Sequence, residues 1–162
     1  MTPTLGTIRP SMIPEVGVNF GFALPHASGP EDVCAIRGRL FRAGAEVRAG
    51  EVDFGSSKHV ATVILTAMKT DPSMSSGLNL RYDRSVVERA RRRGMEVGSF
   101  DRSDEPEGRS TMEWGVERVA EERGGLPDLI YDLGSVGKEG MIRVLGRNPG
   151  DVLRKVRLLT GG

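Results

Sequence analysis

The stretch FGSSKHVATVILTAMK, residues 54–69, marks the point where the hydrophobic pattern of the chain changes from that of strands to that of a helix. Its apolar residues recur three and four positions apart, as on the buried face of an α-helix. They are Val60, Val63, Ile64, Ala67 and Met68. Ser56 or Ser57 stands where an N-cap is expected, so the pattern predicts a helix over residues 58–69 with one buried face.

The segments on either side of this helix predict a mixed architecture. Residues 17–24, 32–42 and 46–55 are rich in Val, Phe and Ile and are separated by glycine-containing turns, which is typical of strands joined by hairpins. Further along, strands are predicted at 77–83, 95–101, 126–134 and 141–146, and helices at 84–93, 110–125 and 148–159. Strands followed by such alternation indicate an α/β layered sandwich with a mixed sheet.

Three of these helices carry signals at their ends. Gly94 and the pair Gly124–Gly125 stand where helices commonly terminate. Ser110 and Glu113 have the spacing of a capping box at the start of the 110–125 helix. Asn148 followed by proline predicts the start of the last helix.

Composition limits the classes of function. The chain has 162 residues, a net charge of +1, 38% hydrophobic and 28% charged residues, and no internal repeat, so we expect one domain over 1–162. The charge balance favours neither nucleic acid nor membrane as a partner, and the basic run at 88–93 is interpreted as an exposed helix face. Cys34 has no partner for a disulfide and is expected to be a buried thiol. Without a signal peptide or an apolar run of membrane-spanning length, a cytoplasmic location is expected.

His59 stands in the first turn of the 58–69 helix, where unpaired N–H groups and the helix dipole favour anions. A neutral imidazole there could exchange a proton near pH 7, while Lys58 and the N–H groups of Ser56 and Ser57 hold a phosphate. The alternative is a histidine bonded to a loop carbonyl beside a solvated lysine.

A glycine-rich segment, DLGSVGKEG at 132–140, offers a second candidate anion site. It does not match the nucleotide-binding loop, because Asp132 replaces a glycine and Glu139 replaces Ser or Thr. A tight turn at Gly137 could still expose N–H groups, with Lys138 neutralising a phosphate oxygen. The alternative is a plain turn between strands.

Asn79 and Arg81 lie near the carboxyl end of a predicted strand, where α/β sheets commonly bind ligands. Arg81 could bind a phosphate with its fork of N–H groups, or it could pair with Asp83 in solvent. Asp101 and Glu105 belong to an acidic loop that could bind Mg²⁺, although a solvated acidic turn explains it equally. Two histidines are too few for a three-histidine zinc site.

Set in order, several blocks of the chain resemble the archaeal-type thiamine-phosphate synthase domain, the ThiN family. The blocks are PEVGVNFGFALPHA (14–27), DVCAIRGRL (32–40), FGSSKHVATVILTAMKTDP (54–72), LNLRYD (78–83), SFDRSDEPE (99–107), STMEWG (110–115) and DLIYDLGSVGKEGMIRVLG (128–146). The resemblance extends from about residue 13 to residue 158, which leaves residues 1–12 as an expected poorly ordered or extended N-terminal segment. It implies a three-layer α/β/α domain related to the class II aldolase-like fold.

The implied reaction joins hydroxymethylpyrimidine diphosphate to hydroxyethylthiazole phosphate, with Mg²⁺ assisting, and gives thiamine phosphate and pyrophosphate. The resemblance implies a catalytic histidine at His59 and a catalytic arginine at Arg39, with Arg37 as the other possibility. The turn residues Gly137, Lys138 and Glu139 are counted with the substrate-binding groups. Gly140 stands where the family has proline, which loosens the turn without removing a charge.

Relatives of this family are often fused to a pyrimidine kinase, so such a fusion or association is possible, and a homodimer is plausible. Two other functions are kept open. One is a non-catalytic sensor of thiamine phosphate that works in a regulator, against which the retained His59 and the lack of a recognisable DNA-binding element count. The other, by analogy of fold alone, is an aldolase-like lyase, which the shortage of metal-binding histidines disfavours.

Overall fold

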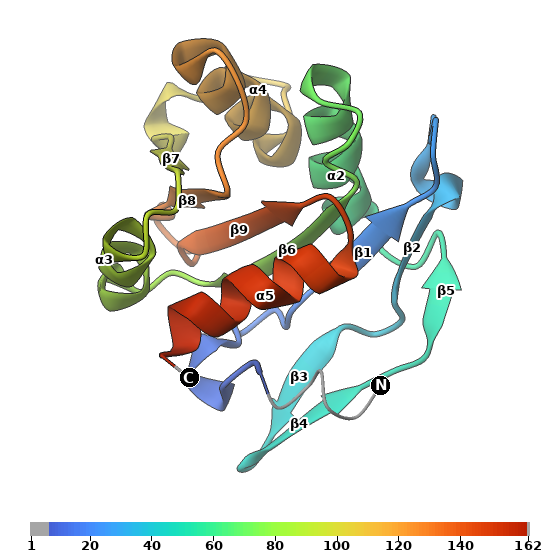
Figure 1. Cartoon of the computed structure of the whole chain (residues 1–162), viewed down its shortest axis with the longest axis vertical. Helices are drawn as coiled ribbons and strands as arrows, with labels where there is room; N and C mark the ends of the chain where they lie inside the picture. Colours follow the sequence, from blue (N-terminus) through green and yellow to red (C-terminus); the bar gives the residue numbers. More distant parts are fainter. Residues whose placement is uncertain (1–6, 162) are drawn as a thin grey trace.

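The computed structural model describes residues 7–161 and has a seven-stranded sheet at its centre (Figure 1). The strand order is β5-β2-β1-β6-β9-β8-β7, and a separate two-stranded sheet pairs β3 with β4. The strands are β1 (Phe20–Ala23), β2 (Val33–Ile36), β3 (Leu40–Ala43), β4 (Glu46–Ala49), β5 (Val52–Phe54), β6 (Ser76–Arg81), β7 (Val97–Ser99), β8 (Leu129–Asp132) and β9 (Met141–Gly146). Only β7 and β8 pair in parallel, so the predicted mixed sheet is confirmed.

Four helices cover the two faces of this sheet (Figure 1). They are α2 (Lys58–Thr70), α3 (Arg84–Arg92), α4 (Thr111–Arg123) and α5 (Pro149–Thr160), and the 3₁₀ turns are η1 (Pro10–Met12), η2 (Pro30–Asp32) and η3 (Arg102–Asp104). Helices α3 and α5 pack on one face, where Leu78, Leu80 and Ile142 are buried against them. Helices α2 and α4 pack on the other, over Ile130 and Leu145. The three-layer α/β/α arrangement is therefore confirmed.

Helix α2 forms where the hydrophobic period predicts it. The Ser57 hydroxyl accepts a hydrogen bond from the N–H of Val60 at 3.5 Å, so Ser57 rather than Ser56 is the N-cap. The helix lies close to the sheet because glycines on β1 and β6 face it. A Cβ added at Gly21 would lie 3.0 Å from Val60, and one at Gly77 would lie 3.3 Å from Ile64.

Two of the segments predicted as single strands are each divided in two. Residues 32–42 contain β2 and β3, because Gly38 and Arg39 both have positive φ and turn the chain out of the main sheet. Residues 46–55 contain β4 and β5, with Gly50 between them. A Cβ at Gly50 would lie 2.0 Å from the Arg37 carbonyl oxygen, so a close approach of two main-chain segments requires a glycine there.

Two smaller expectations were wrong. The Ser110–Glu113 capping box does not form, because Glu113 instead contacts Lys69 of α2 at 3.3 Å. Cys34 is half-buried, and its thiol donates to the Phe22 carbonyl. The N-terminal expectation falls partly on residues 1–6, which lie outside the described residues. Beyond them the chain is packed rather than loose, since Ile8 and Met12 are buried in the core.

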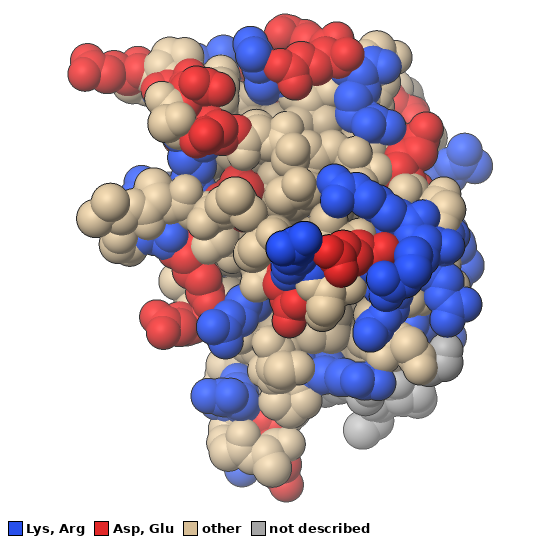
Figure 2. Space-filling view, turned by 90° about the vertical axis from the view of Figure 1, so that its left-hand side faces the viewer, with Lys and Arg blue, Asp and Glu red and all other residues tan. Residues whose placement is uncertain are grey.

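The basic run at 88–93 forms an exposed face of α3 together with acidic neighbours. Arg84 pairs with Glu88 at 2.9 Å, and Arg91 lies over the Tyr131 ring. Figure 2, which shows the side of the molecule that carries α3, has Asp and Glu side chains among the Lys and Arg side chains. No helix in residues 7–161 has the length and apolar character needed to cross a membrane.

Candidate active site

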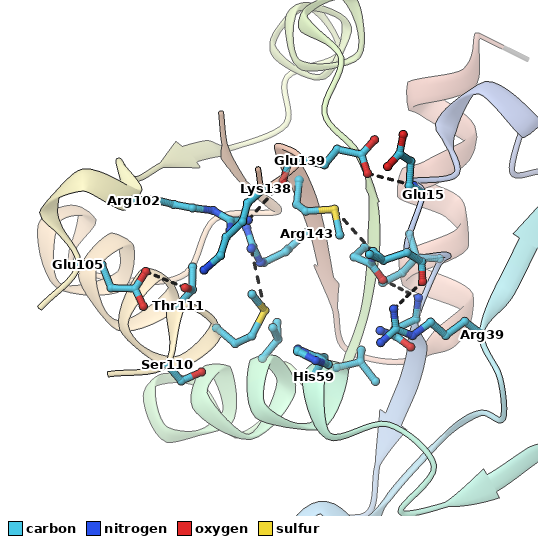
Figure 3. Close-up of a pocket in the computed structure, with 18 of the residues that line it drawn as sticks. Glu15, Arg39, His59, Arg102, Glu105, Ser110, Thr111, Lys138, Glu139 and Arg143 are labelled. Atoms are coloured by element: carbon cyan, nitrogen blue, oxygen red, sulfur yellow. Dashed lines mark hydrogen bonds between the residues drawn. The ribbon is translucent and has the colours of Figure 1, made fainter. Parts of the chain in front are cut away.

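A cavity of about 610 Å³ opens on the α2 and α4 side of the sheet, between the N-terminal turns of these two helices (Figure 3). Its sheet wall comes from β6 and β9, which present Asn79 and Arg143 opposite one another in register. The first turns of α2 and α4 contribute His59 and Thr111. Because the positive ends of two helix dipoles meet there, the cavity is suited to an anionic ligand. Its volume is in the range of pockets for small organic molecules.

The cavity brings together only part of the predicted site. Arg39, His59, Asn79, Glu105, Gly137, Lys138 and Glu139 all line it. Ser56, Ser57, Lys58, Arg81 and Asp101 are not among its lining residues, and neither is Arg37.

The two arginines that flank Gly38 are separated by the turn between β2 and β3. Arg37 is exposed and pairs with Asp53 on the neighbouring strand β5. Arg39 lies in the cavity wall, where its Nη1 donates to the carbonyl of Val16. Its φ of +67° is unusual for a residue other than glycine, and strained backbone of this kind tends to cluster at functional sites. The geometry therefore favours Arg39 over Arg37.

The mouth of α2 differs from the expected phosphate site. Ser57 is buried and its hydroxyl is used as the helix cap, and Lys58 is exposed outside the cavity. His59 is the residue of this turn that faces the cavity, and its side chain is accessible (Figure 3). The imidazole therefore remains placed for a ligand, whereas the expected lysine is not.

Asn79 has a structural role in the cavity wall. Its Oδ1 accepts from the main-chain N–H of Asn19, and its Nδ2 donates to the Gly17 carbonyl at 3.2 Å. Both polar ends of the amide are thus used by the segment that precedes β1. Asn19 itself is only 5% exposed and lines the cavity. Within residues 7–161, its Oδ1 is the one buried side-chain oxygen or nitrogen without a hydrogen-bond partner.

The glycine-rich segment forms a tight hairpin that is largely bonded to itself. The N–H groups of Ser135 and Lys138 donate to each other's carbonyls, and the N–H of Gly134 donates to the Asp132 carboxylate at 2.8 Å. Glu139 accepts from the main-chain N–H of Glu15 and pairs with Arg81 at 3.3 Å. Arg81 is therefore paired with Glu139 rather than with Asp83, the alternative partner that the sequence offered, and Asp83 caps α3. Lys138 points into the cavity, and its role toward a phosphate stays a prediction (Figure 3).

Sequence reasoning missed a charged cluster in the floor of the cavity. Asp132 at the end of β8 is fully buried and binds both Arg143 Nη1 at 2.8 Å and Arg102 Nε at 2.7 Å. Burial, opposed by the Asp132 carboxylate, lowers the pKa of Arg143, and the positive charge of Arg102 lowers it further. A signal was present, because a lone arginine in the apolar strand MIRVLG requires a buried anion or a ligand.

Comparison with known proteins agrees with this geometry. The family model described as thiamine-phosphate synthase ThiN matches residues 7–158. The chain belongs to the ThiN family. Its relatives include the bifunctional thiamine biosynthesis protein ThiDN of Methanocaldococcus jannaschii, 42% identical over 92% of this chain, and the thiamine-phosphate synthase ThiN of Methanothermobacter thermautotrophicus, 35% identical over 93% of it.

This ThiN-family chain spans 36% of the length of the bifunctional relative and 86% of the length of the second. A crystal structure of the C-terminal domain of a phosphomethylpyrimidine kinase is 41% identical to it and superposes with a TM-score of 0.89 over 98% of this chain and 93% of that one. The sequence match thus shows the ThiN family, and the superposition shows that the fold is shared with that domain.

The ThiN cavity also places carboxylates near its cations. Glu105 lies in the wall and accepts a hydrogen bond from the Thr111 hydroxyl at 2.6 Å. Asp101, the other candidate metal ligand, is turned away, and its carboxylate accepts from the N–H of Ser103. In the described part of the chain, no three His, Cys, Asp or Glu side chains are grouped as metal ligands.

Proposed function

We propose that this chain catalyses the condensation of hydroxymethylpyrimidine diphosphate with hydroxyethylthiazole phosphate to give thiamine phosphate and pyrophosphate. The observation that carries the proposal is that Arg39 and His59, which are distant in sequence, line one cavity in a member of the thiamine-phosphate synthase ThiN family. The same cavity holds a surplus of cationic side chains for two phosphorylated substrates.

The reaction determines what the cavity must do. The bond between the pyrimidine methylene carbon and the diphosphate oxygen breaks, and its electron pair leaves with the diphosphate. The lone pair of the thiazole nitrogen then forms the new carbon–nitrogen bond. Because that nitrogen carries no hydrogen, this step needs no base to remove a proton from it. His59 therefore acts on the phosphate oxygens, either by donating a hydrogen bond to developing charge or by orienting a phosphate.

The apolar wall of the cavity suits the two rings. Val60 and Val63 of α2 are buried beneath it, and the flexible thioethers of Met112 and Met141 lie beside them. Such a surface excludes water from the carbocation-like centre that forms when diphosphate departs, and it holds the rings at a distance suited to attack.

Magnesium fits this arrangement as an ion bound mainly by the substrate. Mg²⁺ is commonly held by one or two carboxylates together with substrate phosphates. Of the carboxylates that line the cavity, Glu139 is paired with Arg81, and Glu105 is the one that would hold the ion. The bound ion would neutralise charge on the departing diphosphate.

The pyrimidine substrate must be supplied by phosphoryl transfer to a hydroxymethylpyrimidine. We infer that this chain works with a pyrimidine kinase activity, either on the same polypeptide or on a separate one. Support comes from the bifunctional relative and from the similar C-terminal domain of a phosphomethylpyrimidine kinase.

Incubation of the protein with both substrates and Mg²⁺ tests the proposal, with thiamine phosphate as the measured product. His59→Ala should lower turnover by about 10²- to 10⁴-fold if His59 assists the chemical step. The thermal midpoint should stay close to that of the wild type, because the side chain is exposed. Tight binding of thiamine phosphate by a wild-type protein without turnover would instead identify a sensor.

A further inference from the structure

Three charged side chains are packed together on one side of the cavity, with one carboxylate between two guanidinium groups. Asp132 is 0% exposed and Arg143 is 2% exposed, and the Arg102 side chain is 10% exposed. Because one carboxylate balances one positive charge, the cluster retains an excess positive charge in a largely dry environment. An uncompensated buried charge is costly unless a ligand balances it.

Neighbouring carboxylates do not neutralise the excess positive charge of this cluster. Glu139 reaches Arg102 only through its main-chain carbonyl, at 3.4 Å, while its carboxylate pairs with Arg81. Glu105 accepts from the Thr111 hydroxyl. Among the ion pairs formed within residues 7–161, Asp132 is the only acidic partner of Arg102 and Arg143.

The two guanidinium groups also keep donors available for a ligand. Arg143 directs Nη2 toward the Met112 sulfur at 4.0 Å, which is a weak acceptor. Arg102 uses Nε for Asp132. Figure 3 shows Lys138 pointing into the same part of the cavity, whereas Arg39 approaches from the opposite side.

We propose that Arg102 and Arg143, positioned by Asp132, form the diphosphate subsite, and that the Arg39 side of the cavity takes the single phosphate of the thiazole. The assignment rests on the proposed function for the identity of the two ligands. Two guanidinium forks match the several oxygens and the higher charge of a diphosphate better than one does. When the carbon–oxygen bond breaks, the electron pair moves onto the oxygen that these arginines face.

The test is calorimetric titration with inorganic pyrophosphate, with and without Mg²⁺. Arg102→Gln removes the excess charge and leaves the one-to-one Arg143–Asp132 pair intact. It should weaken pyrophosphate binding about 10- to 100-fold, the loss expected for a charge-assisted hydrogen bond. Arg39→Gln should change that affinity less than about threefold. Arg84→Gln, which removes the same charge from the exposed surface of α3, is the matched control.

A wild-type affinity for pyrophosphate in Arg102→Gln, or an equal loss in Arg39→Gln, would overturn the assignment. If Arg102→Gln does not fold, Arg102→Lys replaces it, because this variant keeps the charge and loses only the fork. Arg102→Lys should bind pyrophosphate more weakly than the wild type and the Arg84→Gln control do, without losing binding altogether. A pyrophosphate affinity equal to that of the wild type would again overturn the assignment.

The outcome is separable from that of the proposed function. Pyrophosphate binding that depends on Arg102, in a protein that forms no thiamine phosphate, would support the subsite and contradict the function. Turnover in which Arg102→Gln leaves the KM for the pyrimidine diphosphate unchanged would support the function and contradict the subsite.

Discussion

Two asparagines in the cavity wall differ in whether their side-chain amides are already hydrogen-bonded within the protein. Asn79 uses both ends of its amide for the main chain of residues 17–19. Asn19 is buried with its Oδ1 unpaired, although its main-chain N–H is bonded. Buried polar atoms are nearly always paired, so an unpaired one beside a cavity points to a partner within the cavity, either an ordered water or a ligand.

Asn19→Ala should therefore affect binding more than stability. The folded protein no longer has to bury an unpaired polar group, and this gain offsets the packing that the smaller side chain loses. The free energy of unfolding should therefore change by less than about 1 kcal/mol. The affinity for thiamine phosphate should fall about tenfold. Urea denaturation and calorimetric titration measure the two effects. Asn79→Ala is the contrasting variant, and it should lose stability because it leaves two main-chain groups unpaired.

Helix α2 links the packing of the sheet to the chemistry of the cavity. Its buried face contacts β1 and β6 at two glycines, and its first turn carries His59 into the cavity. A displacement of the helix would consequently move the imidazole. The hairpin at 132–140 is anchored in a similar way, because Asp132 binds both the arginines and the N–H of Gly134.

Gly21→Ala should displace α2. The new Cβ would lie 3.0 Å from Val60 Cγ1 and 3.2 Å from Ile64 Cδ1, so the free energy of unfolding should fall by about 1–3 kcal/mol, as in overpacked cores. Turnover should fall further than substrate affinity, because His59 moves with the helix. Gly125→Ala is the control, since its added Cβ meets no described atom within 4 Å. An unchanged unfolding curve for Gly21→Ala would contradict the close packing.

Across the whole molecule, a repeated Asp-x-Ser pattern contributes to the response of stability to acid. Asp71, Asp83 and Asp101 each accept a hydrogen bond from the N–H of the serine two residues later. Hydrogen bonds from these serines lower the pKa of all three aspartates below the ordinary 3.8. A carboxylate with a lowered pKa contributes stability above the unfolded pKa and loses it as the pH falls through the folded value.

Stability should therefore not depend on these three groups between pH 5 and 7, and it should fall as the pH drops below about 4. Urea midpoints measured from pH 2.5 to pH 7 check this. Asp83→Asn should have a shallower fall in acid and an almost unchanged midpoint at pH 7, because Asn is an equally good N-cap. A loss of stability that begins between pH 5 and 7 in both proteins would point to other titrating groups.

The sequence by itself determined the features that depend on neighbours along the chain. The position of α2, the alternation of strands and helices after it, and the start of α5 at Asn148 follow from hydrophobic period and end signals, which act over one or two turns. His59 was a candidate from its place in the first turn of α2, the resemblance to a family added Arg39, and the cavity contains both.

Only the tertiary structure decided how charges are distributed around the cavity. Arg102, Asp132 and Arg143 come from a loop and two strands, and they meet because β8 and β9 are neighbours in the sheet. Whether a polar side chain bonds to other groups of the protein or stays available for a ligand depends on partners that lie far away in sequence. For that reason Asn79, Lys58 and Arg81 were assigned to ligands by their local surroundings alone, whereas Asn19 and the arginine cluster went unnoticed until the strands were paired.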